Sequence, residues 1–169
     1  MESARLPSDP RARTPGAEPE MLMDEPQDRL QLDSRLSELS IVVPWAEALS
    51  DRYGLREETR YAMNLCLEEA LANVVQHGYN NEPGHPIVIE AYVSAGSLFF
   101  AVEDKAPPFA PVDPGERTPR PLVLDAMEPG GNGIRLIHRF AGSVSYEALP
   151  DGNRLTIGFP VPVAKKASA

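Results

Sequence analysis

The spacing of apolar residues predicts one long helix over residues 56–78. Apolar side chains recur there every three or four positions, which places them on one face of a helix. They are Met63, Leu67, Ala70, Leu71 and Val74. His77 and Gly78 end the pattern, and turn-like residues 79–84 follow. This is the strongest helical signal in the chain.

A second helix is predicted to follow Ser34, whose side chain is the expected N-terminal cap. Its apolar face consists of Leu36, Leu39, Val43, Ala46 and Leu49. Pro44 lies inside this pattern, and proline interrupts the hydrogen bonds of a helix. The helix must therefore kink at Pro44 or begin a second piece there. Gly54 is the expected C-terminal cap.

Alternating or apolar runs predict strands at residues 29–32, 87–94, 98–104, 143–148 and 154–159. The short connections 95–97 and 151–153 predict two antiparallel hairpins. A short helix is expected at residues 133–140, after a glycine-rich run. Paired strands separated by helices indicate an α+β fold. We expect a two-layer α/β sandwich, with helices on one face of a mixed, mainly antiparallel sheet.

The ordered domain is predicted to span residues 27–162. Residues 1–26 are rich in proline and charge, which is typical of a disordered tail. Residues 163–169 are small and polar and are expected to be a flexible C-terminal tail. Residues 105–130 contain seven prolines and little periodicity. So long a connection in a compact domain is usually a functional lid or disordered.

Charge and composition exclude several classes of function. The chain has 169 residues and a net charge of −9, so it lacks the clustered basic surface that nucleic-acid binding requires. No apolar run approaches the roughly 20 residues that cross a membrane, and the first ten residues carry no apolar signal region. The single cysteine, Cys66, has no internal disulfide partner. We therefore expect a cytoplasmic protein.

The long helix carries candidate chemical groups beside its apolar stripe. Glu69 and Asn73 are one helical turn apart, so they share a face, and His77 continues it. An amide oxygen can bind magnesium while a neighbouring carboxylate takes a proton from a hydroxyl or water. The competing interpretation is a polar helix edge that makes local hydrogen bonds.

Two further segments add candidates. Asp104 ends a predicted strand, where its carboxylate can accept a hydrogen bond from an exocyclic amine such as that of adenine. Residues 130–133 read Gly-Gly-Asn-Gly and precede a helix. Glycines there let backbone amides approach an anion, and the helix N-terminus favours negative charge. Taken singly, both features are also ordinary turn chemistry.

The three features in this order resemble the GHKL ATPases, a family that includes histidine-kinase catalytic domains, gyrase-type ATPases and anti-sigma-factor serine kinases. The resemblance covers residues 28–160. Residues 68–79 (EEALANVVQHGY) look like the N box of the anti-sigma kinases. Residues 104–109 (DKAPPF) and 130–134 (GGNGI) are similar to the two glycine boxes, and residues 152–157 (GNRLTI) to the closing strand pair.

The resemblance implies a Bergerat-type ATP-binding fold, with ATP and magnesium as cofactors and a set of site residues. Glu69 would be the general base, Asn73 the magnesium ligand and Asp104 the acceptor for the adenine amine. Gly131 and Gly133 would let the lid close over the phosphates, and Thr156 would support the adenine. The implied cofactor-binding set is Asn73, His77, Asp104, Ala106, Gly131, Gly133 and Thr156.

The stand-alone anti-sigma branch fits the chain length best. That branch implies a protein-serine/threonine kinase that acts as an anti-sigma factor in partner switching. It would phosphorylate a serine or threonine of an anti-anti-sigma (antagonist) protein and hold a sigma factor or another regulator. A homodimer is also implied, whereas direct contacts with nucleic acid or a membrane are not.

One position departs from the family pattern. Ala106 occupies the place of a glycine, and a Cβ there is costly if the backbone requires a positive φ. This departure, together with the proline-rich lid, motivates a second hypothesis, a non-catalytic interaction module with weak or lost nucleotide binding. A third is a plain ATPase whose phosphoryl acceptor is water. Arg117, Arg120 and Arg135 are the candidate cations for the γ-phosphate.

Overall fold

A computed structural model describes residues 25–108 and 133–162. The predicted tails and lid therefore lie outside the described residues, apart from residues 25–26 and 105–108. The elements are β1 (Asp28–Asp33), a 3-10 turn (Leu36–Glu38), α1 (Leu39–Arg52), α2 (Glu57–Asn73), a π-helical turn (Val74–Gly78), β2 (Pro86–Ser94), β3 (Ser97–Asp104), α3 (Gly133–Phe140), β4 (Ser143–Leu149) and β5 (Gly152–Pro160).

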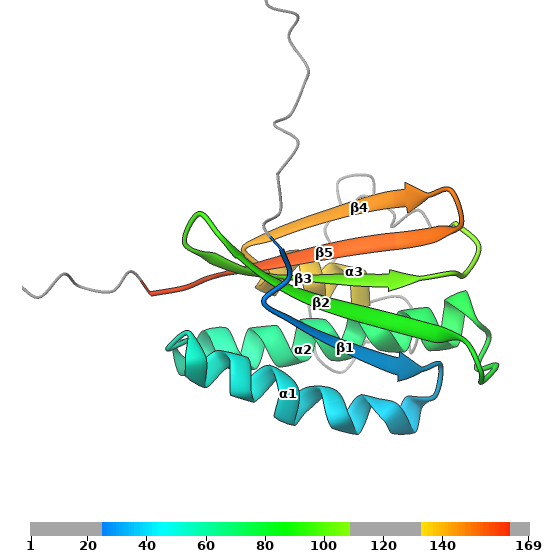
Figure 1. Ribbon diagram of the computed structural model, residues 1–169, viewed down its shortest axis with the longest axis horizontal. Helices are drawn as coiled ribbons and strands as arrows, with labels where there is room; N and C mark the ends of the chain where they lie inside the picture. The colour runs from blue at the N-terminus through cyan, green and yellow to red at the C-terminus, as the bar shows by residue number, and fades with distance from the viewer. Residues whose placement is uncertain (1–24, 109–132, 163–169) are drawn as a thin grey trace, which may run out of the picture.

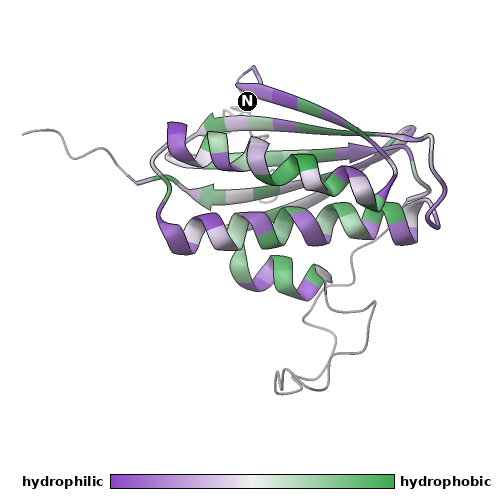
Figure 2. Ribbon diagram, turned by 90° about the horizontal axis from the view of Figure 1, so that it is seen from below, coloured by the Kyte–Doolittle hydropathy of each residue, from purple (hydrophilic) through white to green (hydrophobic). Residues whose placement is uncertain are grey.

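The strands form one sheet in the order β1-β2-β3-β5-β4. Every neighbouring pair is antiparallel, so the described sheet is antiparallel throughout rather than mixed. Figure 1 shows α1 and α2 against one face of the sheet, and Figure 2 shows α3 on the same side. The predicted two-layer α+β sandwich is confirmed.

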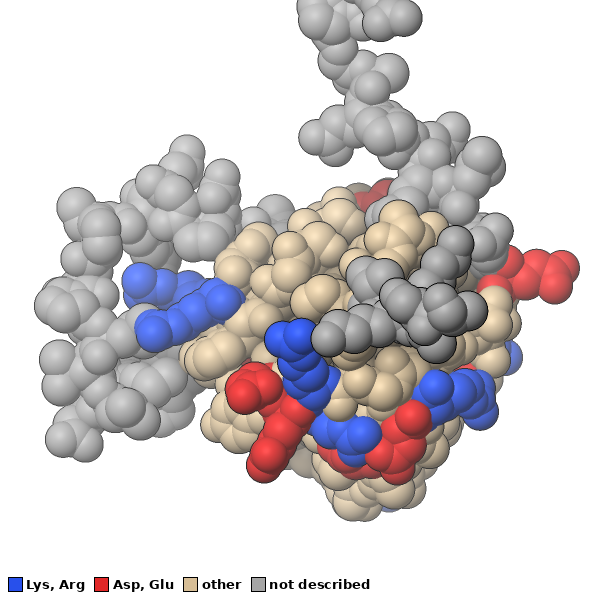
Figure 3. All heavy atoms as spheres, turned by 90° about the vertical axis from the view of Figure 1, so that its left-hand side faces the viewer, with Lys and Arg blue, Asp and Glu red and all other residues tan. Residues whose placement is uncertain are grey.

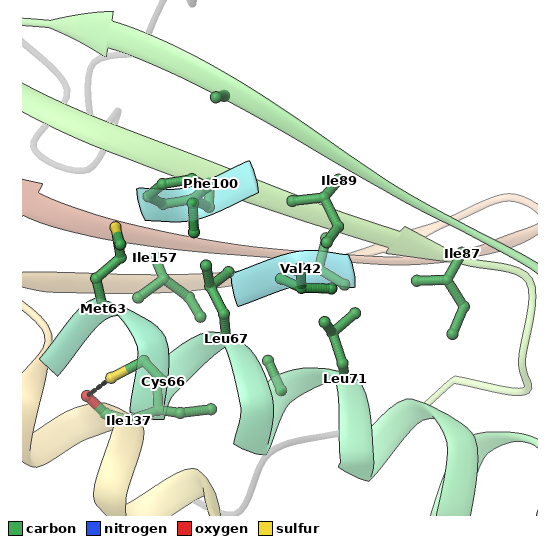
Figure 4. Close-up of a cluster of buried hydrophobic side chains, with 14 of the residues drawn as sticks. Val42, Met63, Cys66, Leu67, Leu71, Ile87, Ile89, Phe100, Ile137 and Ile157 are labelled. Atoms are coloured by element: carbon green, nitrogen blue, oxygen red, sulfur yellow. Dashed lines mark hydrogen bonds between the residues drawn. The ribbon is translucent and has the colours of Figure 1, made fainter. Parts of the chain in front are cut away.

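The core lies between α2 and the central strands. Met63, Leu67 and Leu71 of α2 are fully buried and point toward Phe100 of β3 and Ile157 of β5 (Figure 4). Ala70 is buried as well and Val74 is partly buried, so the predicted stripe is the packed face. Burial of each large aliphatic side chain contributes about 1.5–3 kcal/mol. This face fixes the rotation of α2 relative to the sheet.

The central strand β3 alternates between two environments. Leu98, Phe100 and Val102 join the core under the helices, whereas Phe99 and Ala101 form a small cluster on the opposite face. This period of two is the ordinary geometry of a strand. The residues at 95 and 96 have φ values of 47° and 76°, so a two-residue turn of the type favoured in hairpins joins β2 to β3.

The predicted start of the first helix is wrong. Ser34 caps no helix: its hydroxyl donates to the carbonyl of Glu82 (2.7 Å) and accepts from the amide of His85 (3.1 Å). Ser34 thereby ties the end of β1 to the entry of β2. The helical segment instead begins as the 3-10 turn, whose N-terminal flanking residue, Arg35, makes no side-chain cap.

The buried face of α1 is also rotated from the predicted one. Val42, Ala46 and Leu49 are buried, while Leu36 and Val43 are each 46% exposed. The helix continues through Pro44, so no second piece begins there. The predicted cap at Gly54 is confirmed, because its φ of +62° lets Leu55 donate back to the carbonyl of Ser50 (2.9 Å).

A polar network joins α1 to α2. Arg60 pairs with Glu47 (3.2 Å) and Asp51 (2.6 Å), and Asn64 donates to Glu47 (2.5 Å). On the face of the molecule that Figure 3 draws, acidic and basic side chains lie side by side rather than in a patch of one sign. Exposed pairs of this kind contribute about 0–1 kcal/mol each, so packing rather than charge holds the two helices.

A glycine lets β5 approach the end of β3. The strand begins at Gly152, two residues earlier than predicted, and a Cβ at this position would lie 1.9 Å from the carbonyl oxygen of Asp104. That neighbour is backbone and cannot move aside without disturbing the sheet.

We expect Gly152→Ala to lower the free energy of unfolding by about 3 kcal/mol or more, since overpacking against backbone cannot relax. Urea unfolding measures this change. Asp151→Ala is the matched control, because it removes only an exposed ion pair with Lys105 (3.4 Å). A Gly152→Ala variant as stable as the control would contradict the described approach of β5 to Asp104.

Candidate functional site

The site begins where α2 changes its winding. The α-helix ends at Asn73, and one π-helical turn continues it to Gly78. Single π turns occur frequently at functional sites. Glu69 and Asn73 stand one turn apart at this end of the helix, as the sequence predicted.

Both side chains have polar atoms that the surrounding protein satisfies poorly. Burial, and secondly the neighbouring Glu68 carboxylate, raise the pKa of Glu69. The Asn73 Nδ2 atom is buried and has no hydrogen-bond partner among the described residues. A buried amide without a partner costs free energy, so Asn73 is suited to a partner that arrives from outside the chain.

The start of α3 packs directly on this pair. A Cβ at Gly133 would lie 2.7 Å from Glu69 Oε2 and 2.9 Å from Asn73 Nδ2. A side chain at this position would therefore require the ends of the Glu69 and Asn73 side chains to shift. The structure brings Gly133, Glu69 and Asn73 together, while Gly131 lies outside the described residues.

Asp104 approaches the same region from the end of β3. It is 8% exposed, and its Oδ1 accepts hydrogen bonds from the Ala106 amide and from Asn153 Nδ2, both at 2.8 Å. Burial raises the pKa of Asp104, whereas these two donors lower it. The donors stabilise the ionised carboxylate that a hydrogen-bond acceptor requires.

A pocket connects these elements. Its lining comes from α2 and the π turn, the end of β3, the start of α3, and β4 and β5. The lining residues are Ala70, Asn73, Val74, Gly78, Asp104, Ala106, Ile134, Tyr146, Asn153 and Leu155. The cavity measures about 40 Å³, whereas typical ligand pockets enclose roughly 300–1,000 Å³. A large ligand would therefore have to widen it.

Ala106 sits in this pocket without backbone strain. The non-glycine residues with positive φ in the described part are Asn80, Asn81 and Ala95, so Ala106 is not among them. A Cβ at Gly78 would lie 2.9 Å from the Ala106 Cβ. The methyl group thus occupies space that residue 78 leaves by lacking a side chain, and the strain expected from the missing glycine does not arise.

Two of the predicted site residues lie away from the pocket. His77 is exposed on the π turn and is not part of the lining. Thr156 is buried, but it pairs with Ala101, which belongs to the opposite face of the sheet. Since successive residues of a strand alternate between faces, Leu155 points into the pocket and Thr156 points away from it.

The sequence reading missed the polar partners of Asp104. Asn153 lies opposite Asp104 in the pairing of β3 with β5, and Tyr146 of β4 donates from its hydroxyl to Asn153 Oδ1 (2.6 Å). The sequence predicts a turn at residues 151–153, whereas β5 begins at Gly152. Extending the final strand by two residues would have brought Asn153 opposite Asp104. Of the candidate phosphate cations, Arg135 lies partly buried in α3, and Arg117 and Arg120 lie outside the described residues.

Comparison with known proteins decides the family. The model of the histidine kinase-like ATPase domain matches residues 32–159, which is most of the chain. The chain belongs to the histidine kinase-like ATPase domain family. The predicted resemblance is confirmed.

Two relatives indicate which members of the family this chain resembles. The serine/threonine-protein kinase BtrW of Bordetella bronchiseptica is 32% identical over 141 residues, covering 80% of this chain and 94% of the relative. The anti-sigma F factor of Oceanobacillus iheyensis is 28% identical over 85 residues, or 50% of this chain and 58% of the relative. One is named a serine/threonine-protein kinase and the other an anti-sigma factor, the two properties that the predicted branch combines.

A solved structure bears on the fold alone. The RsbU and RsbW domains of a Mycobacterium tuberculosis protein superpose with a TM-score of 0.55 at 15% identity, over 80% of this chain and 33% of that one. Helices long and apolar enough to span a membrane do not occur in the described part of this ATPase-like domain.

The donor set of this ATPase-like domain fits a magnesium–nucleotide better than a metal held by protein alone. Within the described residues there is no cluster of three or more His, Cys, Asp or Glu side chains that could hold a metal ion. Magnesium usually takes one or two protein ligands and the phosphates of a substrate. Asn73 lines the pocket, and its amide oxygen is of the type that ligates magnesium, whereas its buried, unpartnered Nδ2 is a donor that suits a phosphate oxygen.

We expect Glu69→Gln to stabilise the fold at pH 7. The folded state raises the pKa of Glu69, so the proton-bound form is the favoured one. The stability linked to that proton is present below the ordinary pKa of glutamate, about 4.3, and is lost as pH rises through the folded value. A neutral glutamine avoids this loss.

Thermal unfolding at pH 7 and near pH 4 measures the effect. The midpoint of Glu69→Gln should exceed that of the unchanged chain at pH 7, and the difference should shrink near pH 4. Glu58→Gln is the matched control, because Glu58 is exposed on the same helix and is not among the groups that raise the pKa of Glu69. A Glu69→Gln variant that unfolds earlier at pH 7 would show that the carboxylate stabilises the fold.

Proposed function

We propose that this chain is an ATP-dependent protein-serine/threonine kinase that acts as an anti-sigma factor in a partner-switching system. The observation that carries the proposal is the convergence of Asp104 and Asn73 on one pocket, with Glu69 one turn from Asn73. The names of the two relatives, a serine/threonine-protein kinase and an anti-sigma F factor, support the same activity.

Each residue has a role that its surroundings suit. Asp104 accepts a hydrogen bond from the 6-amino group of adenine. Asn73 binds the magnesium ion, and Glu69 accepts the proton of the attacking hydroxyl, a task helped by a raised pKa. The nucleotide supplies the phosphoryl group, and its metal ion neutralises charge on the phosphates.

Nucleotide binding would require the pocket to widen. Ile134 belongs to its lining, and Gly133 packs on Glu69 and Asn73. The first turn of α3 is therefore the element that must move for the phosphates to reach Asn73. The unstrained backbone at Ala106 weakens one of the two motives for a nucleotide-free interaction module. The other motive, the proline-rich connection 105–130, lies mostly outside the described residues.

The proposed partners follow from the same assignment. The phosphoryl acceptor is a serine or threonine of an anti-anti-sigma protein, and the second partner is a sigma factor or another regulator, within the cytoplasm. The net charge of −9 favours partners with basic patches and disfavours direct contact with nucleic acid. The chain itself would act as a homodimer.

Glu69→Gln is expected to lower the rate of phosphoryl transfer by at least about a hundredfold while leaving nucleotide affinity within a few fold, since general-base catalysis contributes roughly 10²–10⁴-fold. The measurement is transfer of labelled phosphate from magnesium-ATP to anti-anti-sigma proteins of the same cell. Glu58→Gln, which changes an exposed glutamate of the same helix, should retain the rate.

Two results would count against the proposal. Transfer that survives Glu69→Gln would remove Glu69 as the base. Release of phosphate without any protein acceptor, at a rate unaffected by the antagonist, would favour a plain ATPase.

A further inference from the structure

We propose that Tyr146 and Asn153 are positioning residues that hold Asp104 as a fixed acceptor, so that the pocket selects purines with an amino group at position 6. The inference rests on the proposed function, because it concerns how the same pocket chooses its nucleotide. The hydrogen bonds among these three side chains carry it.

The three side chains form one directed chain across the sheet. The Tyr146 hydroxyl on β4 donates to Asn153 Oδ1 on β5 (2.6 Å), and Asn153 Nδ2 donates to Asp104 Oδ1 on β3 (2.8 Å). Asn153 is 5% exposed and lines the pocket, as does Tyr146. Buried hydrogen-bond networks of this kind fix the orientation of each member.

The amide of Asn153 has only one workable orientation. Its Nδ2 faces three acceptors: Asp104 Oδ1, the Ala106 carbonyl (3.1 Å) and the Pro107 carbonyl (3.4 Å). Rotating the amide would place its oxygen against all three. It would also turn the NH₂ group toward the Tyr146 hydroxyl, which now donates to the oxygen. The three acceptors therefore set the orientation, and the Tyr146 hydroxyl, which can donate or accept, completes it as a donor to Asn153 Oδ1.

This orientation decides what Asp104 offers a ligand. Both donors within the described residues, Asn153 Nδ2 and the Ala106 amide, bond to Oδ1. An ionised carboxylate has about four acceptor sites, so Oδ2 keeps its capacity on a residue that lines the pocket. The donors also oppose the effect of burial, which raises the pKa of Asp104.

Base selection follows from the chemistry of position 6. The amino group of adenine can donate to Asp104 Oδ2, whereas the carbonyl of a 6-oxopurine would face it as a second acceptor. A site discriminates strongly against a ligand that would leave its buried polar groups without hydrogen-bond partners. Without Tyr146 and Asn153, the carboxylate can turn or take up a proton, and a protonated acid can donate to a carbonyl.

The test compares the affinities of magnesium-ATP and magnesium-ITP. In ITP a carbonyl replaces the 6-amino group and N1 carries a hydrogen. Calorimetry of the whole chain should give a clear preference for ATP. Tyr146→Phe keeps the ring and removes the hydroxyl, and it should lower the ATP-to-ITP preference about tenfold, the effect of roughly one hydrogen bond to a charged network. Tyr92→Phe is the matched control, because the Tyr92 hydroxyl bonds to Glu90 outside the pocket.

The outcomes separate the inference from the proposed function. An unchanged preference in Tyr146→Phe, with ATP still bound, would overturn the inference alone. Failure of the folded, unchanged chain to bind either nucleotide would overturn both. An equal loss for ATP and ITP would assign Tyr146 a structural role only and so overturn the inference.

A second measurement needs no nucleotide. Carbon NMR can follow the titration of the Asp104 carboxyl group in the unchanged chain and in Asn153→Ala. Loss of the Asn153 donor should raise the pKa of Asp104, because that donor lowers it in the intact site. An unaltered titration in a folded Asn153→Ala variant would contradict the positioning role.

Discussion

The packing of α2 against the sheet is the constraint on which the site depends. Met63, Leu67 and Leu71 can be buried against Phe100 and Ile157 in only one rotation of the helix. That rotation leaves Glu69 and Asn73, which lie beside the apolar stripe, at the edge of the core, where the pocket opens toward α3. Both side chains are half-buried because the apolar stripe beside them is buried completely. The raised pKa of Glu69 and the buried Nδ2 of Asn73 follow from this position.

The register of β3 with β5 supplies the other half of the site. It sets Asp104 opposite Asn153, and Gly152 lets the two backbones approach closely enough for the pairing. Hydrogen bonds then hold the carboxylate toward the pocket. The helix layer and the sheet layer thus each contribute one side of a single cavity, and the beginning of α3 closes it. Polar groups are tolerated beside the core because they line this cavity.

The sequence allowed the local parts of this arrangement to be predicted, because helical periodicity, hairpin connections and the glycine at position 54 are properties of neighbouring residues. It did not allow the non-local parts. Ser34 bonds to partners 48 and 51 residues away, which no capping rule anticipates. The role of Thr156 near the adenine is implied by the family resemblance, whereas its pairing with Ala101 turns it to the opposite face of the sheet. Only the pairing of β3 with β5 shows that Asn153 is the neighbour of Asp104.

Calorimetric titration of the folded chain with magnesium-ATP tests the central claim most directly. The account predicts one saturable site, with affinity at least about tenfold weaker in Asn73→Ala, since a ligand bond to a charged group is lost. Gln76→Ala, an exposed position on the adjoining turn, should bind as the unchanged chain does. Absence of binding, or equal binding by Asn73→Ala, would contradict the placement of the nucleotide between α2 and the sheet.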